Sequence, residues 1–166
     1  MRIRSLAARV RLMGFDVDGV LTDGSLVFGP DGDTFKTFSS LDGHGIKLLA
    51  EAGIEVAIIS GRRSAALAHR AQNLGIAELH MGVDDKLAVL QDLLAARGLA
   101  ANAAGYMGDD VVDLPILRAC GFSATVADGH ALVKREVDYV ARLPGGRGAV
   151  REICDLLLAA RGAGNT

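Results

Sequence analysis

Short apolar runs alternate with amphipathic stretches along almost the whole chain. Runs rich in β-branched residues predict short strands, and stretches with apolar residues every three or four positions predict helices. We expect strands over residues 10–15, 56–59, 78–81, 104–107, 121–126 and 138–140 and helices over 46–51, 64–74, 84–97, 111–119 and 149–160. Repeated strand–helix units with short links predict an α/β fold with a doubly wound, mostly parallel sheet and right-handed crossovers.

Two segments depart from this alternation. Two β-prone runs, residues 26–28 and 34–38, flank the turn Gly29-Pro30-Asp31-Gly32-Asp33 and predict a β-hairpin. The hairpin, over about residues 25–38, follows an acidic motif and is expected to overhang it as a flap. The first nine residues carry three arginines and predict a small amphipathic helix that covers the sheet.

Composition narrows the class of protein. With 166 residues and half of them hydrophobic, residues 1–166 are expected to form a single domain with a substantial core. A net charge of −2 argues against a general nucleic-acid binder. Cys120 and Cys154 lie in apolar stretches and are interpreted as reduced thiols of a cytoplasmic protein. No segment approaches the length of a transmembrane helix, so no membrane partner is expected.

The candidate chemistry begins where the first expected strand ends, at Asp16 and Asp18. Two carboxylates separated by one residue can there converge on one point, and a divalent cation would keep them ionised and aligned. Gly19 and Gly24 let the chain turn sharply and leave room for a bulky anion. This arrangement suits phosphoryl transfer through an aspartyl-phosphate, with Asp16 attacking and Asp18 moving the proton. A surface turn rich in Asp and Gly is the alternative.

A second acidic cluster follows a later expected strand. Asp109 and Asp113 are four residues apart at a strand-to-helix junction, so both can face one site, and Asp110 lies between them. Oxygen ligands without a nearby His or Cys pattern favour Mg²⁺ over Zn²⁺. We expect Asp109 to bind the metal and Asp110 and Asp113 to support it. The alternative is that these aspartates only cap the following helix.

Two further residues complete the candidate site. Ser60 follows a β-branched strand and precedes Gly61, so its hydroxyl and the neighbouring amides could hold phosphoryl oxygens. Lys86 lies near the start of a helix, where the helix dipole disfavours a cation unless an anion is close. Its expected role is to neutralise Asp16 and the transferred phosphoryl group. A plain helix cap and a solvated lysine are the respective alternatives.

In this order the motifs resemble the haloacid dehalogenase (HAD) superfamily of phosphatases. The resemblance is carried by Asp16-Val-Asp18-Gly-Val-Leu-Thr, Ser60-Gly61-Arg62, Lys86 and Gly108-Asp109-Asp110-Val-Val-Asp113. It is closer to the branch of 3-deoxy-D-manno-octulosonate 8-phosphate (KDO 8-phosphate) phosphatases. That branch is indicated by Asp42-Gly43-His44-Gly45-Ile46, by Arg70 ahead of Leu74-Gly75-Ile76, and by the run from Gly145 to Glu152. The similarity spans residues 10–158.

The resemblance implies roles for the site residues and an assembly. Asp16 would be the nucleophile and a Mg²⁺ ligand, Asp18 the general acid/base that also lends a backbone oxygen to the metal, and Asp109 the remaining protein ligand. Members of this HAD-like branch lack a large cap domain and form homotetramers in which a neighbouring subunit helps to close each active site. The hairpin fits such an interface. The Gly-rich segment and helix over 145–160 would lie near the site.

The resemblance also implies the substrate contacts. They fall on Asp18 and Lys86 and on a set expected to hold the sugar: Ser39, Ser40, Leu41, Asp42, Gly43, Lys47, Arg62 and Arg70. An arginine can grip the carboxylate of a keto-acid sugar in a bidentate manner. Lys47 and Arg70 could instead be solvated helix surface. The branch often has Asn-Val-Arg-Asp-Gly where this chain has Ser-Ser-Leu-Asp-Gly, so Leu41 replaces an expected arginine, and Met81 departs from a usual Gln.

The motifs therefore predict a Mg²⁺-dependent phosphatase, and the resemblance implies that it hydrolyses KDO 8-phosphate in lipopolysaccharide precursor synthesis. A related nonulosonate 9-phosphate is the alternative substrate. A phospho-accepting signalling domain is an alternative of a different class, but it would carry its phosphoacceptor on a central strand without a proton-shuttling Asp two residues later. A non-catalytic oligomeric scaffold is a third possibility, which the intact acidic set disfavours.

Overall fold

A computed structural model describes residues 1–162, without the side chains of Asp33 and Thr34. Its centre is a parallel sheet with the strand order β5-β4-β1-β6-β7-β8. The strands are β1 (Leu12–Phe15), β4 (Glu55–Ile59), β5 (Glu78–His80), β6 (Ala104–Met107), β7 (Phe122–Thr125) and β8 (Tyr139–Val140). The predicted doubly wound α/β fold is confirmed.

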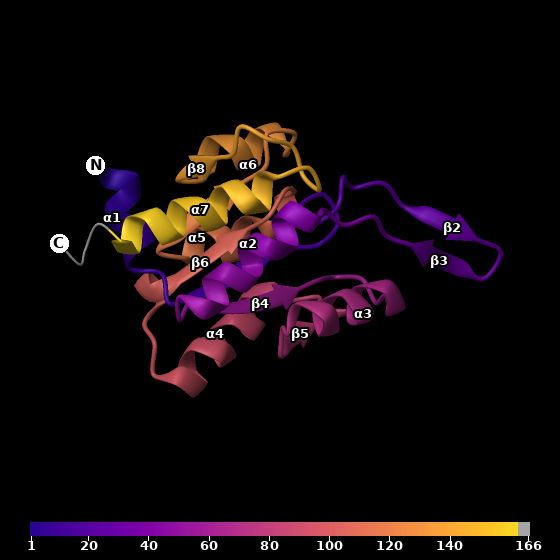
Figure 1. The fold of residues 1–166 in the computed structure, drawn as a ribbon, viewed down its shortest axis with the longest axis horizontal. Helices are drawn as coiled ribbons and strands as arrows, with labels where there is room; N and C mark the ends of the chain where they lie inside the picture. Colours follow the sequence, from indigo (N-terminus) through magenta and orange to yellow (C-terminus); the bar gives the residue numbers. More distant parts are fainter. Residues whose placement is uncertain (163–166) are drawn as a thin grey trace.

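Helices cover both faces of the sheet (Figure 1). The helices α1 (Arg2–Ala8), α2 (Ser40–Glu51), α3 (Ala65–Leu74) and α7 (Ala149–Gly162) share one core layer, and α4 (Lys86–Arg97), α5 (Leu114–Ala119) and α6 (Ala131–Glu136) share the other. Side chains alternate along the strands, so Phe15 and Ile58 pack into the first layer, while Leu12 and Ile59 pack into the second. Because both faces of the sheet are buried, these strands are continuous apolar runs in the sequence.

The central strand β1 contains a glycine for a steric reason. A Cβ atom at Gly14 would lie 2.7 Å from the ring of Tyr106 on the neighbouring strand β6. Tyr106 is fully buried, and its hydroxyl donates a hydrogen bond to the carbonyl of Ile59, 3.2 Å away. This contact ties together the three strands whose carboxyl ends carry the acidic motifs and Ser60.

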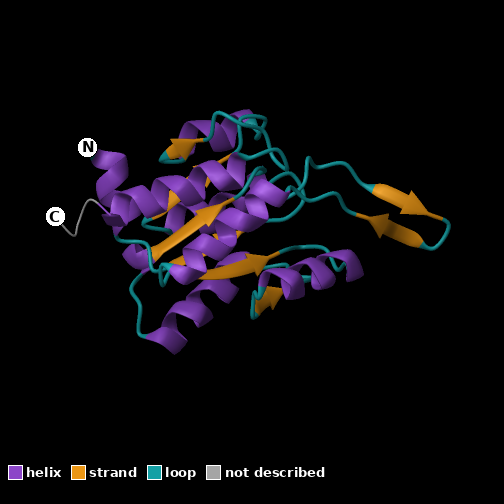
Figure 2. Cartoon of the chain, in the orientation of Figure 1, coloured by secondary structure: helices purple, strands orange, loops and turns teal. Residues whose placement is uncertain are grey.

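The predicted hairpin is confirmed and extends away from the sheet (Figures 1 and 2). Its strands, β2 (Val27–Gly29) and β3 (Gly32–Phe35), form a separate antiparallel pair. Phe28 and Phe35 are 61% and 69% exposed, although large aromatic side chains usually lie in a core. The hairpin therefore presents apolar surface that the described chain does not bury.

Two expected helices have different bounds, and one further helix was not predicted. Helix α2 begins at Ser40 rather than residue 46, because the Ser39 hydroxyl caps it by accepting from the backbone N–H of Asp42. The helix expected over 111–119 divides into a 3₁₀ turn, Val111–Asp113, and α5. Helix α6 was not predicted, because six residues give too weak a periodic signal; a second 3₁₀ turn spans Ala101–Ala103.

The early start of α2 has a packing reason. Gly45 lies so close to α7 that a Cβ there would meet Cys154 and Arg151 at about 3 Å. Gly45 therefore lets α2 and α7 approach each other closely. The predicted N-terminal helix is confirmed as α1, which packs beside α7. No helix within residues 1–162 is both long and apolar enough to cross a bilayer.

Candidate active site

The candidate site is a cavity of about 490 Å³ at the carboxyl ends of β1, β4 and β6. The chain passes from β1 outward to β4 and β5, then returns to β6 on the other side of β1, so the strand order reverses here. Ligands of open α/β sheets bind at such switch points. The cavity lining includes seven of the expected site residues: Asp16, Asp18, Ser60, Arg62, Lys86, Asp109 and Asp110.

A buried ion triad lies at the base of the cavity. Lys86 Nζ is 3.0 Å from Asp16 Oδ1 and 2.7 Å from Asp113 Oδ1, and Asp113 has no exposed surface. Lys86 is the first residue of α4, whose N-cap Asp85 accepts from the N–H of Ala88. The helix thus begins where its first side chain can enter the cavity, and the expectation that Lys86 faces an anion is confirmed.

Burial and crowding shift the protonation of this cluster. Burial, together with the neighbouring Asp113 charge, raises the pKa of Asp16 to about 8, although Lys86 opposes the rise. Burial, together with Asp113 and Asp110, raises the pKa of Asp109 to about 6. Burial alone would lower the pKa of Lys86, but attraction by Asp16 and Asp113 outweighs it and raises that pKa. The carboxylates outnumber the cation, so the cluster favours a further positive charge.

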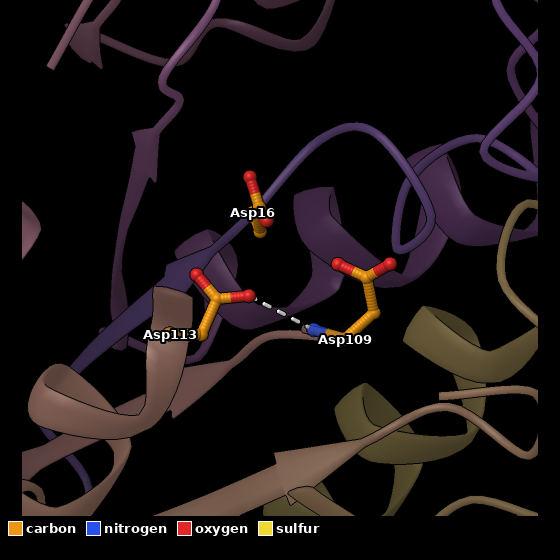
Figure 3. Close-up of side chains that lie close together, drawn as sticks. All are labelled: Asp16, Asp109 and Asp113. Carbon is orange, nitrogen blue, oxygen red and sulfur yellow. Dashed lines mark hydrogen bonds between the residues drawn. The ribbon is translucent and has the colours of Figure 1, made fainter. Parts of the chain in front are cut away.

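The donor set fits a hard divalent cation. Asp16, Asp109 and Asp113 each offer a carboxylate oxygen, and these oxygens lie within 4.8 Å of one another (Figure 3). Gly19 leaves room for the Asp109 carboxylate. A Cβ atom at Gly19 would lie 2.0 Å from Asp109 Oδ2, so a larger residue there would collide with it. Oxygen ligands in such a group suit Mg²⁺.

Asp113 organises the second acidic motif. Its Oδ1 accepts from Lys86, and its Oδ2 accepts from the backbone N–H groups of Asp109 and Asp110 at 3.1 and 3.2 Å. Asp110 caps the 3₁₀ turn by accepting from the N–H of Val111 at 2.7 Å, as the capping alternative predicted for it. Asp113 therefore holds the loop that presents Asp109.

Asp18 has a different environment from Asp16. Its Oδ1 lies 2.6 Å from Lys36 Nζ, and its Oδ2 lies 3.9 Å from Arg62 Nε. Its carboxylate is not in the acidic group around Asp109, and the metal contact expected from its backbone oxygen stays a prediction. Lys36 was not predicted to lie at the site, because a single lysine in a hairpin arm gives no signal of what it contacts.

Ser60 occupies the predicted place directly after β4. It is 1% exposed, and its hydroxyl oxygen accepts from the N–H of Arg62 at 3.3 Å. Its backbone N–H donates to the carbonyl of His80, so the residue is fixed by the neighbouring strand β5. This geometry holds the hydroxyl at the cavity wall, where phosphoryl oxygens could reach it.

The Gly-rich C-terminal segment supports the turn that follows Asp16. The N–H of Gly146 donates to the carbonyl of Val20 at 3.0 Å, and a Cβ at Gly145 would lie 1.9 Å from the carbonyl oxygen of Gly19. Within the turn, the Thr22 hydroxyl oxygen accepts from the N–H groups of Gly19 and Gly24. The segment predicted to lie near the site thus touches the backbone beside Asp18.

Most of the expected sugar contacts lie elsewhere. In the described part of the chain, the cavity lining does not include Ser39, Ser40, Leu41, Asp42, Gly43, Lys47 or Arg70. Asp42 is buried between α2 and α7, where its Oδ1 accepts from the N–H of Arg151 at 3.0 Å. Arg70 donates to the Ser39 carbonyl at 3.2 Å and lies 5.8 Å from the Phe38 ring centre. Their contact with a sugar stays a prediction, and Arg62 is the member of this set at the cavity.

Comparisons with known proteins agree with this geometry. No family model matches the chain. The chain is 46% identical over 156 residues to the KDO 8-phosphate phosphatase of Escherichia coli K12, covering 94% of this chain and 83% of that protein. It superposes on the Yersinia pestis phosphatase structure with a TM-score of 0.94 and 44% identity, covering 97% of this chain and 87% of that one.

A third comparison concerns a structure with bound ligands. The Moraxella catarrhalis KDO 8-phosphate phosphatase, solved with magnesium, phosphate and KDO, superposes with a TM-score of 0.93 and 39% identity, over 96% of this chain and 92% of that one. Identity above 40% to a curated phosphatase over nearly the whole chain, together with the acidic motifs in their expected places, decides the assignment. The chain belongs to the KDO 8-phosphate phosphatase family of the HAD superfamily.

Proposed function

We propose that this protein is a Mg²⁺-dependent phosphatase that hydrolyses KDO 8-phosphate to KDO and phosphate in lipopolysaccharide precursor synthesis. The observation that carries this proposal is the buried Asp16–Lys86 pair at the cavity base, in a chain that closely superposes on a relative solved with magnesium, phosphate and KDO. A carboxylate beside a lysine and two further carboxylates matches what phosphoryl transfer requires, because bound Mg²⁺ would keep Asp16 ionised.

In the first half-reaction Asp16 is the nucleophile. One carboxylate oxygen of Asp16 forms a bond to phosphorus while the bond between phosphorus and the sugar oxygen breaks, and Asp18 gives its proton to that leaving oxygen. Lys86 and the Ser60 hydroxyl are placed to hold the phosphoryl oxygens, because both line the cavity around Asp16. The products are the free sugar and a phosphorylated Asp16.

In the second half-reaction water replaces the sugar. Asp18, now a carboxylate, takes a proton from water as the water oxygen forms a bond to phosphorus, and the bond between phosphorus and Asp16 breaks. Asp18 is therefore restored as the acid and Asp16 as the nucleophile. Asp16 and Asp109 are the residues that would hold Mg²⁺, with a backbone oxygen of Asp18. When bound, Mg²⁺ neutralises carboxylate and phosphoryl charge.

The assembly and location are also part of the proposal. The exposed apolar hairpin, with Phe28 and Phe35, supports a homotetramer in which hairpins lie near neighbouring active sites and bring the remote sugar-binding residues of one subunit toward another. We propose that residues 1–166 act as one catalytic domain in the cytoplasm. The thiols support this location, since both cysteines are free, as is usual for proteins of a reducing compartment.

A side-by-side assay tests the proposal. Phosphate release is measured from eight-carbon and nine-carbon 2-keto sugar phosphates, with Mg²⁺ and after chelation, for the wild type and for Asp16→Asn. We expect turnover of the eight-carbon substrate to be preferred, to need Mg²⁺ and to disappear in Asp16→Asn, while Asp92→Asn on the exposed face of α4 retains it. Preference for the nine-carbon sugar would support the alternative substrate, and a stable phosphorylated Asp16 without turnover would support a signalling domain.

A further inference from the structure

The hairpin reaches the active site through one side chain, Lys36. The residue directly follows β3 on the returning arm of the hairpin, and its side chain is only 2% exposed, although Phe35 beside it is 69% exposed. Long lysine side chains are rarely buried unless they are paired. Lys36 Nζ lies 2.6 Å from Asp18 Oδ1, which is the distance of a strong charge-assisted hydrogen bond.

The two lysines of the site have separate partners. Lys86 contacts Asp16 and Asp113 at the cavity base, whereas Lys36 contacts Asp18 from the hairpin side. Asp18 is the more accessible of the two motif carboxylates, with a side chain 21% exposed, against 10% for Asp16. Solvent does not restrain a partly exposed carboxylate, so its orientation depends on the groups that bind it.

Lys36 and Arg62 hold Asp18 from two sides. One carboxylate oxygen is bonded to the hairpin arm, and the other lies 3.9 Å from Arg62, in the segment that follows β4. A proton donor works only within hydrogen-bond reach of the atom it serves, and small displacements are costly. The contact between Lys36 and Asp18 therefore links the position of the hairpin to the side chain that donates a proton to the leaving oxygen.

We propose that Lys36 is a positioning residue for Asp18, so that docking of the hairpin arm is required for efficient transfer of a proton to the departing sugar oxygen. The inference rests on the proposed phosphatase function and adds a hairpin residue to its machinery. Lys36 touches no reacting atom in this role. In the first half-reaction its effect is confined to substrates whose leaving group needs a proton.

Leaving-group chemistry gives a selective test. A sugar alkoxide is a poor leaving group that needs protonation, whereas p-nitrophenolate departs without it, so only the sugar phosphate reports on Asp18. The quantity to compare is kcat/KM, which covers steps up to phosphorylation of Asp16 and not the later hydrolysis. In Lys36→Met we expect kcat/KM for KDO 8-phosphate to fall by about tenfold or more, and kcat/KM for p-nitrophenyl phosphate to change by less than about threefold.

Three variants sharpen the test. Lys36→Arg keeps the charge and should restore most of the lost kcat/KM. In an Asp18→Asn background, Lys36→Met should cause no further loss, because the residue acts only through Asp18. Lys134→Met, at an exposed lysine on α6, is the matched control and should leave both substrates unchanged. If Lys36→Met does not fold, Lys36→Gln carries the same comparison.

The outcomes separate the inference from the function on which it rests. Equal loss on both substrates, or further loss in the Asp18→Asn background, would overturn the positioning role. A changed sedimentation coefficient with loss on both substrates would assign Lys36 to assembly instead. If the wild type releases no phosphate from the sugar substrate, the proposed function fails, whereas retained kcat/KM in Lys36→Met with an active wild type rejects only the role of Lys36.

Discussion

Lys86 Nζ lies 3.0 Å from Asp16 Oδ1, and both side chains are at least 90% buried. The same ammonium also contacts the fully buried Asp113, so one lysine faces two carboxylates that water cannot solvate. This imbalance explains why the site favours a divalent cation. It also makes the site sensitive to the loss of Lys86, to pH and to the removal of metal.

Replacing Lys86 should destabilise the protein as well as inactivate it. Lys86→Met leaves Asp16 and Asp113 buried without their cation, which costs about 3 kcal/mol or more in the metal-free protein. Urea unfolding measures this loss, and added Mg²⁺ should reduce it. We also expect kcat to fall by about a hundredfold, because in the proposed mechanism Lys86 stabilises developing phosphoryl charge. The exposed control Lys134→Met should change the free energy of unfolding by less than about 0.5 kcal/mol.

The stability of the metal-free protein should fall as the pH rises from about 4 to about 8. The folded pKa values of Asp16 and Asp109, about 8 and about 6, lie above the ordinary value of 3.8, so the folded state retains protons that the unfolded state has released. Their contribution is fully favourable below pH 4 and is lost as the pH rises through the folded pKa values. Urea unfolding in chelator should show a decrease on the order of 4 to 5 kcal/mol between pH 5 and pH 8.

Two comparisons isolate the cause of this pH dependence. In Asp16→Asn the decrease should be smaller, because the neutral amide cannot release a proton. Added Mg²⁺ should raise the melting temperature more at pH 8 than at pH 5, since the metal competes with protons for the carboxylates. The same slope in the wild type and in Asp16→Asn would contradict the assignment to this residue.

The C-terminal glycines should matter for both folding and catalysis. Gly146 and Gly75 both have φ of +70°, but a Cβ at Gly146 would lie 2.5 Å from the backbone carbon of Thr22, whereas a Cβ at Gly75 meets nothing within 4 Å. Gly75→Ala should therefore show only the cost of the left-handed backbone, about 1 kcal/mol. Gly146→Ala should cost more in urea unfolding and should also lower kcat, because it displaces the turn beside Asp18.

Arg62 and Arg70 were both expected to bind the sugar, but replacing them should have different effects. Arg62 lines the cavity, so Arg62→Gln should lower kcat/KM for the sugar phosphate by about tenfold and for p-nitrophenyl phosphate by less. Arg70 binds the Ser39 carbonyl and lies over Phe38, so Arg70→Gln should reduce the free energy of unfolding by about 1 kcal/mol. A sugar-selective loss in Arg70→Gln would instead support its expected role as a sugar contact from a neighbouring subunit.

Local sequence patterns were sufficient to predict the sheet and the centre of the site. Asp16, Ser60 and Asp109 each follow a strand end within two residues, and parallel strands bring such ends to one edge of a sheet. Lys86 was predictable because a cation at a helix start needs a nearby anion. These predictions succeeded because each depends on a short segment and on a fold with few possible arrangements.

Only the tertiary structure decided the contacts between distant segments. Whether Lys36 reaches Asp18, whether Asp42 faces a substrate or α7, and whether the C-terminal glycines touch the Asp16 turn all depend on how separate elements pack. The helix expected from residue 46 begins at Ser40, where Gly43 packs against α3 and Gly45 packs against α7. Side-chain direction and burial arise from the assembled core, so local patterns could identify the carboxylates that we propose to react but not the residues that hold them in place.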